Sequence, residues 1–454
     1  MTGFFSINPY NAKSNGFFPF ISSEIVQNRI DKSKDDFYNK WRNIPVKSRA
    51  ANILPVAGYI RQNKDFLAHL ITCEMGKPVK ESIAELEKVA WLIEYHCENA
   101  SRWLRPKKIR TNYSSVYISY QPLGGIFGIM PWNFPFWQVF RFAIPTLLAG
   151  NAVFIKHAPN VPLCALEIEK IFHRFLPAPG IYQNLFIDVT QVEAVIANNF
   201  IQGVSLTGSE TAGSIVGSLA GKHLKKAVLE LGGTDPFIIL DDADQEEAVN
   251  QFILSRMSNN GQICIAAKRL FVQSGVYDKV KELLIAGFSK LRTGDPMDTN
   301  TRISCLARAD LKLGLINQLK KLEDNGAVFL IKNQEVPANK CIPLLLELNK
   351  SHCMDFDEEI FGPVAIIIRF DSIDEVSDLV NSSRYGLAAS LWSKDEKVID
   401  KLINHLETGN IAVNKMVASD PRIPFGGIKK SGYGKEMAES GIKEFVNAKS
   451  VVIN

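Results

Sequence analysis

Residues 203–213 read GVSLTGSETAG, a short apolar strand (203–206) that runs into a turn of small residues and then into a helix. Small residues at such a turn let backbone N–H groups and a hydroxyl approach a pyrophosphate at the helix N-terminus. The same turn also suits tight packing of a helix on a strand, so by itself it establishes only a strand–turn–helix unit. The common nucleotide fingerprints, G-x-G-x-x-G and G-x-x-x-x-G-K-[ST], are absent from the sequence.

Apolar runs alternate with helical patterns on both sides of this unit. The first series of predicted strands lies at 125–130, 152–155, 183–186, 203–206, 227–231 and 237–240. A second series follows a helix at 245–258, with strands at 269–273, 327–331, 364–370 and 409–413. Such alternation is typical of doubly wound parallel sheets. The sequence therefore predicts an α/β protein with two lobes and a ligand crevice between them.

Different patterns occupy the two ends of the chain. Apolar residues recur every three or four positions in 22–42, 46–72 and 79–104, which predicts three helices. From residue 114 the period changes to two, as in a strand with one covered face. The tail, 444–454, is also strand-like, and we expect it to pair with the 114–120 ribbon of a neighbouring subunit.

Composition excludes several classes of protein. The 52 Lys and Arg residues nearly balance 48 Asp and Glu, giving a net charge of +4 with no basic stripe, so nucleic-acid binding is not expected. Seven scattered cysteines without a C-x-x-C pair predict reduced thiols in a cytoplasmic protein, with neither a disulfide framework nor a metal site. No signal-peptide pattern opens the sequence. The uncharged stretch 121–140 contains three prolines, which favours a buried segment over a membrane span.

Cys264 is the first candidate for chemistry. A lone cysteine in apolar surroundings is most often an inert core residue. Here the polar, turn-prone run Asn259-Asn260-Gly261-Gln262 leads directly into it, which favours a loop where a thiolate is accessible.

Two further residues have the character of catalytic groups. Glu230 ends the apolar run 226–231 before two glycines, so it is either a satisfied structural carboxylate or a general base with a raised pKa. Asn133 lies in P-W-N-F-P (131–135), between rigid apolar neighbours. It is either a turn asparagine or an amide positioned to donate to an oxyanion.

Seven motifs in order make the whole chain resemble the aldehyde dehydrogenase superfamily. They are P-W-N-F-P (131–135), I-K (155–156), T-G-S (207–209), E-L-G-G (230–233), G-Q-x-C (261–264), E-I-F-G-P (359–363) and P-F-G-G-x-K-x-S-G-x-G (424–434). The resemblance implies an aldehyde dehydrogenase-like α/β fold in three parts. These are a Rossmann-like cofactor-binding domain (1–110 and 131–231), a small β oligomerisation ribbon (111–130 and 435–454) and an α/β catalytic domain (232–434).

The resemblance also implies a mechanism. Cys264 attacks the aldehyde carbon to give a thiohemiacetal, the Asn133 amide and the Cys264 backbone N–H hold the oxyanion, and hydride transfer to NAD or NADP leaves a thioester. Glu230 then activates water for hydrolysis. The implied cofactor contacts are Trp132 and Ser209 at the pyrophosphate, Lys156 at the adenosine ribose, and Glu359 and Phe361 at the nicotinamide end.

Two departures from the family pattern bear on the cofactor and the substrate. Relatives that prefer NAD often carry Lys-Pro-Ala-Glu, whose glutamate repels a 2′-phosphate, whereas this chain has Lys156-His157-Ala158-Pro159. NADP is therefore open, and His157 or a nearby lysine would favour it. Many relatives also carry a lysine nine residues after the motif asparagine, where this chain has Phe142.

Arg141 is the sequence's best indication of the substrate. It follows Asn133 by about two helical turns among apolar residues, and an arginine there needs an anion, either a substrate carboxylate or a structural Asp or Glu. Ser419, in S-D-P-R before P-F-G-G, would add a hydroxyl at the same end of the tunnel. These features resemble the short bacterial succinate-semialdehyde dehydrogenases, and glutarate semialdehyde or a broad range of aldehydes is the alternative.

Other classes of function fit the sequence less well. A catalytically silent protein on this fold would have lost Cys264 or Glu230, and both are present. A cofactor-free thiol hydrolase would need a histidine base, and no Cys–His signature occurs. The expected partners are a small-molecule aldehyde and further copies of the chain, in a homodimer or homotetramer.

Overall fold

A six-stranded sheet forms the centre of the first lobe. The computed structural model describes residues 2–332, 340–353 and 356–454. The strand order is β19-β9-β8-β5-β6-β7, parallel except for the β19–β9 pair. The strands are β5 (Gly125–Met130), β6 (Ala152–His157), β7 (Tyr182–Asn184), β8 (Ile201–Thr207), β9 (Lys226–Glu230) and β19 (Gly432–Tyr433). The helices that connect them are α6 (Trp137–Leu148), α7 (Pro162–Phe175), α8 (Val192–Ala197) and α9 (Glu210–Lys222). The predicted strand–turn–helix unit is confirmed as β8 followed by α9.

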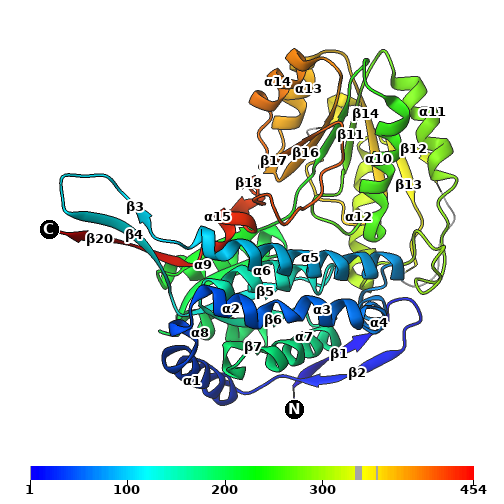
Figure 1. Cartoon of the computed structure of the whole chain (residues 1–454). Helices are drawn as coiled ribbons and strands as arrows, with labels where there is room; N and C mark the ends of the chain where they lie inside the picture. Colours follow the sequence, from blue (N-terminus) through cyan, green and yellow to red (C-terminus); the bar gives the residue numbers. More distant parts are fainter. Residues whose placement is uncertain (1, 333–339, 354–355) are drawn as a thin grey trace.

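N-terminal helices pack on this lobe (Figure 1). They are α1 (Ser23–Asn39), α2 (Val46–Ile53), α3 (Pro55–Gln62), α4 (Lys64–Met75) and α5 (Val79–Trp103). The prediction of one helix over 46–72 is wrong, because Pro55 cannot donate a backbone hydrogen bond and starts a new helix, and a second break falls at Asn63. A hairpin of β1 (Gly3–Ile7) and β2 (Ser14–Pro19) precedes these helices and was not predicted.

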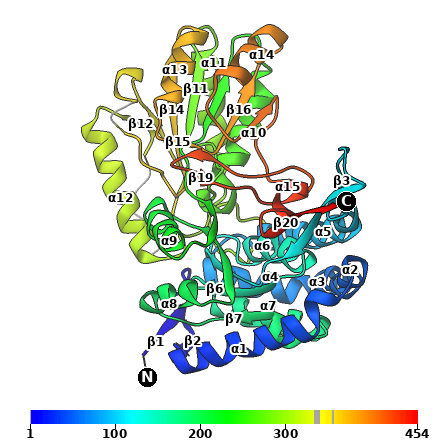
Figure 2. The ribbon, with the colours of Figure 1, turned by 90° about the vertical axis from the view of Figure 1, so that its left-hand side faces the viewer.

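The second lobe is built on a seven-stranded sheet with the order β12-β13-β14-β11-β10-β16-β17. Only the β12–β13 pair is antiparallel. The strands are β10 (Pro236–Ile239), β11 (Arg269–Gln273), β12 (Val328–Ile331), β13 (Leu344–Glu347), β14 (Val364–Phe370), β16 (Ala388–Trp392) and β17 (Asn410–Val413). The helices are α10 (Gln245–Met257), α11 (Tyr277–Phe288), α12 (Ala309–Asp324), α13 (Ile373–Asn381) and α14 (Glu396–His405). Figure 2 shows this lobe above the first, as two consecutive α/β series predict.

A three-stranded ribbon projects from the first lobe and carries the C-terminus at its end (Figure 1). It contains β3 (Lys107–Lys108), β4 (Ser115–Pro122) and β20 (Val446–Ile453), which follows the short helix α15 (Ala438–Ile442). β20 pairs antiparallel with β4 of its own chain, so the prediction that the tail pairs with the 114–120 ribbon of a neighbouring subunit is wrong. The expected covered face of β4 is also absent, because its residues are exposed or half-buried throughout. The segment 111–130 divides between two sheets, since β5 pairs with β6 and β8.

The apolar stretch that resembles a membrane span lies in the interior of the first lobe. It forms the end of β4, the strand β5, a turn at 131–136 and the start of α6. Every residue of α6 is buried. In the part of the chain that the structure describes, no helix is long and apolar enough to cross a membrane.

Candidate active site

Cys264 lies where two cavities meet. The first cavity, of about 300 Å³, is lined mainly by α5, α6, the Cys264 loop and residues 416–425. The second, of about 380 Å³, lies at the carboxyl ends of the first lobe's strands, beside the start of α9. Cys264 and Gln138 line both cavities. Because Cys264 is half-buried and open to both hollows, it is not the inert core residue of the alternative interpretation.

A turn with left-handed backbone conformation precedes Cys264 and places it where the two cavities meet. Asn259, Asn260 and Gly261 have φ values of 54°, 55° and 73°, a region that only glycine and asparagine adopt readily. The Asn260 amide holds the turn, because its Nδ2 donates to the carbonyls of Gly76 (3.1 Å) and Cys305 (2.8 Å). The polar run before the cysteine is therefore a rigid, buried support.

Arg256 ties the Cys264 loop to the E-I-F-G-P segment. It is fully buried, and its guanidinium donates to the carbonyls of Gly261 (3.2 Å), Ile360 (2.9 Å) and Val364 (2.6 Å), and also to Gly362. Burial lowers its pKa to about 9, so the cation persists at neutral pH. One side chain thus fixes two of the recognised motifs against each other.

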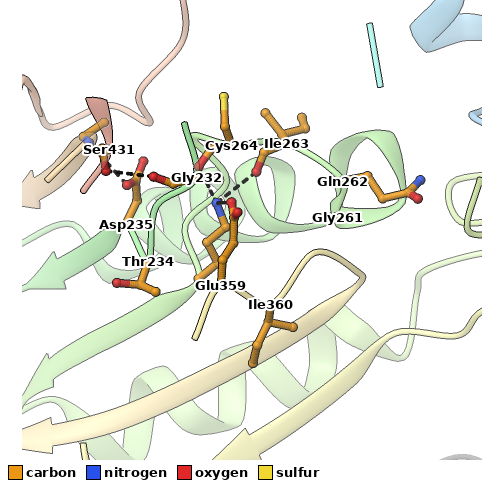
Figure 3. A network of polar contacts seen from close by, with 12 residues as sticks. Gly232, Thr234, Asp235, Gly261, Gln262, Ile263, Cys264, Glu359, Ile360 and Ser431 are labelled. Atoms are coloured by element: carbon orange, nitrogen blue, oxygen red, sulfur yellow. Dashed lines mark hydrogen bonds and ion pairs between the residues drawn. The ribbon is translucent and has the colours of Figure 1, made fainter. Parts of the chain in front are cut away.

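The Cys264 thiol is protonated at rest. Burial raises its pKa to about 11, and the positive charges of Lys268 and Arg141 oppose this rise. Lys268 is buried, donates to the carbonyl of Ile263 (3.0 Å) and to that of Cys264, and pairs with Glu359 Oε1 (3.1 Å). Figure 3 shows Glu359 next to Ile263 and Cys264 in this network. Attack by this sulfur therefore requires a base in the site.

Asn133 is held against the Cys264 loop. Its Nδ2 donates to the carbonyl of Gln262 at 3.0 Å, while its backbone carbonyl accepts from Asn259 Nδ2 at 2.8 Å. An amide nitrogen carries two hydrogens, so one remains for an oxyanion in the second cavity, which Asn133 lines. Glu85 holds the turn that carries Asn133, because its Oε1 accepts from the backbone N–H groups of Phe136 and Trp137, both at 2.8 Å.

Glu230 stands at the end of β9, with its carboxyl group in the second cavity. Neither carboxyl oxygen has a hydrogen-bond partner among the described residues. Burial and the nearby Glu436 raise the pKa of Glu230 well above its ordinary value, and Arg141 and Lys435 oppose the rise. A side chain at Gly426 would come within 2.8 Å of Glu230 Oε1, so the glycines of P-F-G-G leave room for this carboxyl group. An unpaired buried carboxyl is the state expected of a proton acceptor rather than of a structural pair.

Arg141 and Ser419 both line the first cavity, on the same side of Cys264. Arg141 is buried and already has an acidic partner, because its Nε pairs with the Glu436 carboxylate. Its guanidinium also lies over the Phe425 ring, 5.0 Å from the centroid. A structural acid is thus present beside Arg141, and this was the alternative open from the sequence.

The predicted cofactor residues gather mostly around the second cavity, which Trp132, Ser209, Glu359 and Phe361 all line. The rings of Trp132 and Phe361 meet edge to face at 5.8 Å. Ser209 caps α9, accepting from the Ala212 N–H at 3.3 Å. These features fit a nucleotide, since the small residues Gly208 and Ser209 line the cavity where the 13-residue helix α9 begins.

Lys156 and His157 lie at the carboxyl end of β6, beside β5, and are not among the residues that line this cavity. Lys156 is half-buried, and burial lowers its pKa. His157 shares a hydrogen bond with the Pro135 carbonyl (Nε2 to O, 2.9 Å), and burial lowers its pKa to about 4. A neutral, buried imidazole offers no positive charge to a 2′-phosphate, which leaves a nearby lysine as the residue that would favour NADP.

Three basic side chains at the site were not predicted from the sequence: Arg256, Lys268 and Lys88. Arg256 and Lys268 flank the Cys264 loop on α10 and before β11, and both are buried cations. Lys88 lies on α5 and lines the first cavity. The sequence feature that could have indicated them is a basic residue on the apolar side of a helix or at the start of an apolar strand. A charge there is costly unless it is paired or hydrogen-bonded.

The arrangement supports covalent catalysis on a carbonyl compound. A nucleophilic sulfur, an amide donor and an unpaired carboxyl group converge where the two cavities meet. The sequence profile of the aldehyde dehydrogenase family matches residues 2–451, and the chain belongs to this family. The predicted family and fold class are confirmed, and the reaction class is aldehyde oxidation with NAD(P) as acceptor.

Several proteins similar to this chain are named as succinate-semialdehyde dehydrogenases. A probable succinate-semialdehyde dehydrogenase [NADP(+)] of Synechocystis sp. is 41% identical over 99% of each chain. The succinate semialdehyde dehydrogenase [NAD(P)+] Sad of Escherichia coli is 37% identical over 98% of this chain and 97% of its own length. The crystal structure of succinic semialdehyde dehydrogenase from Streptococcus pyogenes with NADP+ superposes with a TM-score of 0.95, at 34% identity over 99% of each chain.

Proposed function

We propose that the protein oxidises succinate semialdehyde to succinate, with NADP as an accepted cofactor. Cys264 adds to the aldehyde carbon, and the Asn133 amide with the Cys264 backbone N–H stabilises the oxyanion. NAD(P), when bound, supplies the nicotinamide ring that accepts the hydride of the aldehyde carbon. Glu230 accepts the proton of the water that hydrolyses the Cys264 thioester, and its raised pKa makes it a stronger base than an ordinary carboxylate.

Residues around the second cavity would hold the cofactor. We assign Ser209 and Trp132 to the pyrophosphate, Glu359 and Phe361 to the nicotinamide end, and Lys156 to the adenosine ribose. NADP is supported by Pro159, which stands where a repelling glutamate occurs in many relatives, and by the relatives named for NADP.

The first cavity supports a substrate with a terminal carboxylate. Its wall brings together Arg141 and the Ser419 hydroxyl on the same side of Cys264. We assign both to the carboxylate end, with Arg141 shared between the substrate and Glu436. The single observation that carries the proposal is this cavity, because it places positive charge on the same side of the nucleophilic Cys264, which also lines the second cavity beside the start of α9.

Steady-state kinetics with succinate semialdehyde and butanal tests the proposal, since butanal has the same chain length and no charge. A buried charge-assisted hydrogen bond contributes about 1.5–3 kcal/mol, so kcat/KM should favour the semialdehyde by about 10- to 100-fold. Reduced nicotinamide is followed by absorbance with NADP and with NAD, and glutarate semialdehyde is included to test chain length. Equal kcat/KM for succinate semialdehyde and butanal would overturn the substrate assignment.

We also propose a homodimer or homotetramer in the cytoplasm, whose subunit has the three predicted parts except that residues 125–130 belong to the cofactor-binding domain, since β5 pairs with β6 and β8. β20 is the outer strand of the ribbon, and in the described chain its outer edge has no strand partner, which suits pairing with another subunit. All seven cysteines are free thiols, which suits a reducing compartment. Native mass spectrometry of the purified chain distinguishes these assemblies from a monomer.

A further inference from the structure

One face of α5 forms a wall of the first cavity. Glu81, Ala84, Glu85 and Lys88 follow a helical spacing of three, one and three residues, and all line the cavity. Glu85 is engaged by backbone N–H groups at the start of α6 and by Lys77. Glu81 is engaged by Arg302 at 3.1 Å. Lys88 is therefore the charged member of this stripe that forms no ion pair among the described residues.

The contacts of Lys88 are with neutral groups. Its Nζ donates to Ser419 Oγ at 2.5 Å and lies 4.1 Å from the centroid of the Trp137 ring. Among the described residues, no carboxylate forms an ion pair with it. Lys88 is half-buried, and burial together with the nearby charge of Arg141 lowers its pKa to about 7. In the free enzyme a positive charge on Lys88 is therefore costly and only partly screened.

Arg141 and Lys88 differ in the charge that they leave for a ligand. Arg141 already pairs with Glu436, so its positive charge is largely compensated inside the protein. Lys88 repels Arg141, and a carboxylate between the two cations would relieve that repulsion. An ammonium has three N–H donors, so one remains for a ligand after Ser419 and the Trp137 face have engaged the others.

We propose that Lys88 is the principal binding residue for the substrate carboxylate, oriented by Ser419 and Trp137. This inference rests on the proposed function, because it requires a substrate with a terminal carboxylate. In this arrangement Arg141 acts as the second cation and chiefly holds Glu436. Both cations lie on the wall of the same cavity, so either variant is expected to affect binding of the carboxylate.

Binding should be coupled to a proton. An adjacent carboxylate raises the pKa of Lys88, so the complex takes up a proton where the free amine is partly neutral. The KM for the semialdehyde should therefore be low below the free-enzyme pKa of about 7 and rise above it, by up to about tenfold per pH unit. The titratable or charged groups around Lys88 are Glu81 and Glu85 on α5, Arg141 on α6, Cys264 on its loop and Asp420 beside Ser419.

The test compares succinate semialdehyde with butanal across roughly pH 6 to 9, a range that spans the titration of a lysine perturbed to this extent. The variants are Lys88→Met, which keeps the length without the charge, and Lys88→Arg, which keeps the charge. Lys80→Met, at an exposed position of the same helix, is the matched control. We expect Lys88→Met to reduce the ratio of kcat/KM values, semialdehyde over butanal, by about 10- to 100-fold, mainly through KM. Lys88→Arg should restore most of the ratio, and Lys80→Met should leave it unchanged.

The outcomes separate the two proposals. A wild-type enzyme without preference for the semialdehyde overturns the proposed function, whatever the variants do. A wild-type preference that survives in Lys88→Met overturns only the role of Lys88. If Lys88→Met does not fold, the wild-type KM profile decides: a semialdehyde KM that tracks the butanal KM through neutral pH contradicts the inference, and a rise confined to the semialdehyde supports it.

Discussion

Replacing Arg256 with methionine should disable the enzyme without touching a reacting group. The guanidinium is fully buried, and it is the shared hydrogen-bond donor of two loops, through the carbonyls of Gly261, Ile360, Gly362 and Val364. A buried carbonyl that loses its partner costs about 1–3 kcal/mol, and removing the buried charge offsets part of the total. We therefore expect a net loss of roughly 3–5 kcal/mol at the contact between the loops.

The consequence for catalysis is a displaced nucleophile. A misplacement of about 1 Å costs on the order of 100-fold in rate, so kcat/KM of Arg256→Met should fall by about that factor for succinate semialdehyde and butanal alike. A melting curve should show a lower transition temperature. Arg369→Met, at an exposed position of β14 in the same lobe, is the control and should retain both properties. Wild-type kinetics and melting in Arg256→Met would refute the view that this arginine positions Cys264.

Two further predictions concern the protons of the site. Lys268 lowers the pKa of the Cys264 thiol, so Lys268→Met should slow alkylation of Cys264 by iodoacetamide at neutral pH by several-fold; an unchanged rate would show that another group sets the thiolate population. Glu436 raises the pKa of Glu230, and the carboxylate of Glu230 forms only as pH rises through that pKa, so Glu436→Gln should move the rising limb of the kcat–pH profile to lower pH. A limb that stays in place or moves to higher pH would argue against Glu230 as the base.

Much of the fold could be predicted because its signals are local. The strands β5, β11 and β14 have the predicted bounds, since each is an apolar run between breaking or polar residues. β16, a short run of mostly small residues, was missed because its identity as a strand depends on β10 and β17, which are distant in sequence. The break at Pro55 was visible in the sequence, but the helical period of the flanking residues obscured it.

The candidate site could be predicted only as far as its motifs reach. Cys264, Glu230 and Asn133 lie in short motifs, and the fold brings all three to the second cavity. The partner of Arg141 could not be predicted, because Glu436 comes from the far C-terminal part of the chain and no spacing rule selects it among the acids. Lys88 was hidden for the same reason, since only the folded chain places α5 beside Ser419 and Cys264.

The central claim is that Cys264 carries the acyl group covalently and that Glu230 is needed to release it. Glu230→Gln should therefore accumulate a thioester in a single turnover with succinate semialdehyde and NADP. Peptide mass spectrometry of the quenched enzyme should find the mass of one succinyl group on the peptide that contains Cys264, and none in the Glu230→Gln/Cys264→Ser double variant. A burst of reduced cofactor from Glu230→Gln with an unmodified Cys264 peptide, or with the acyl group on another residue, would contradict the account.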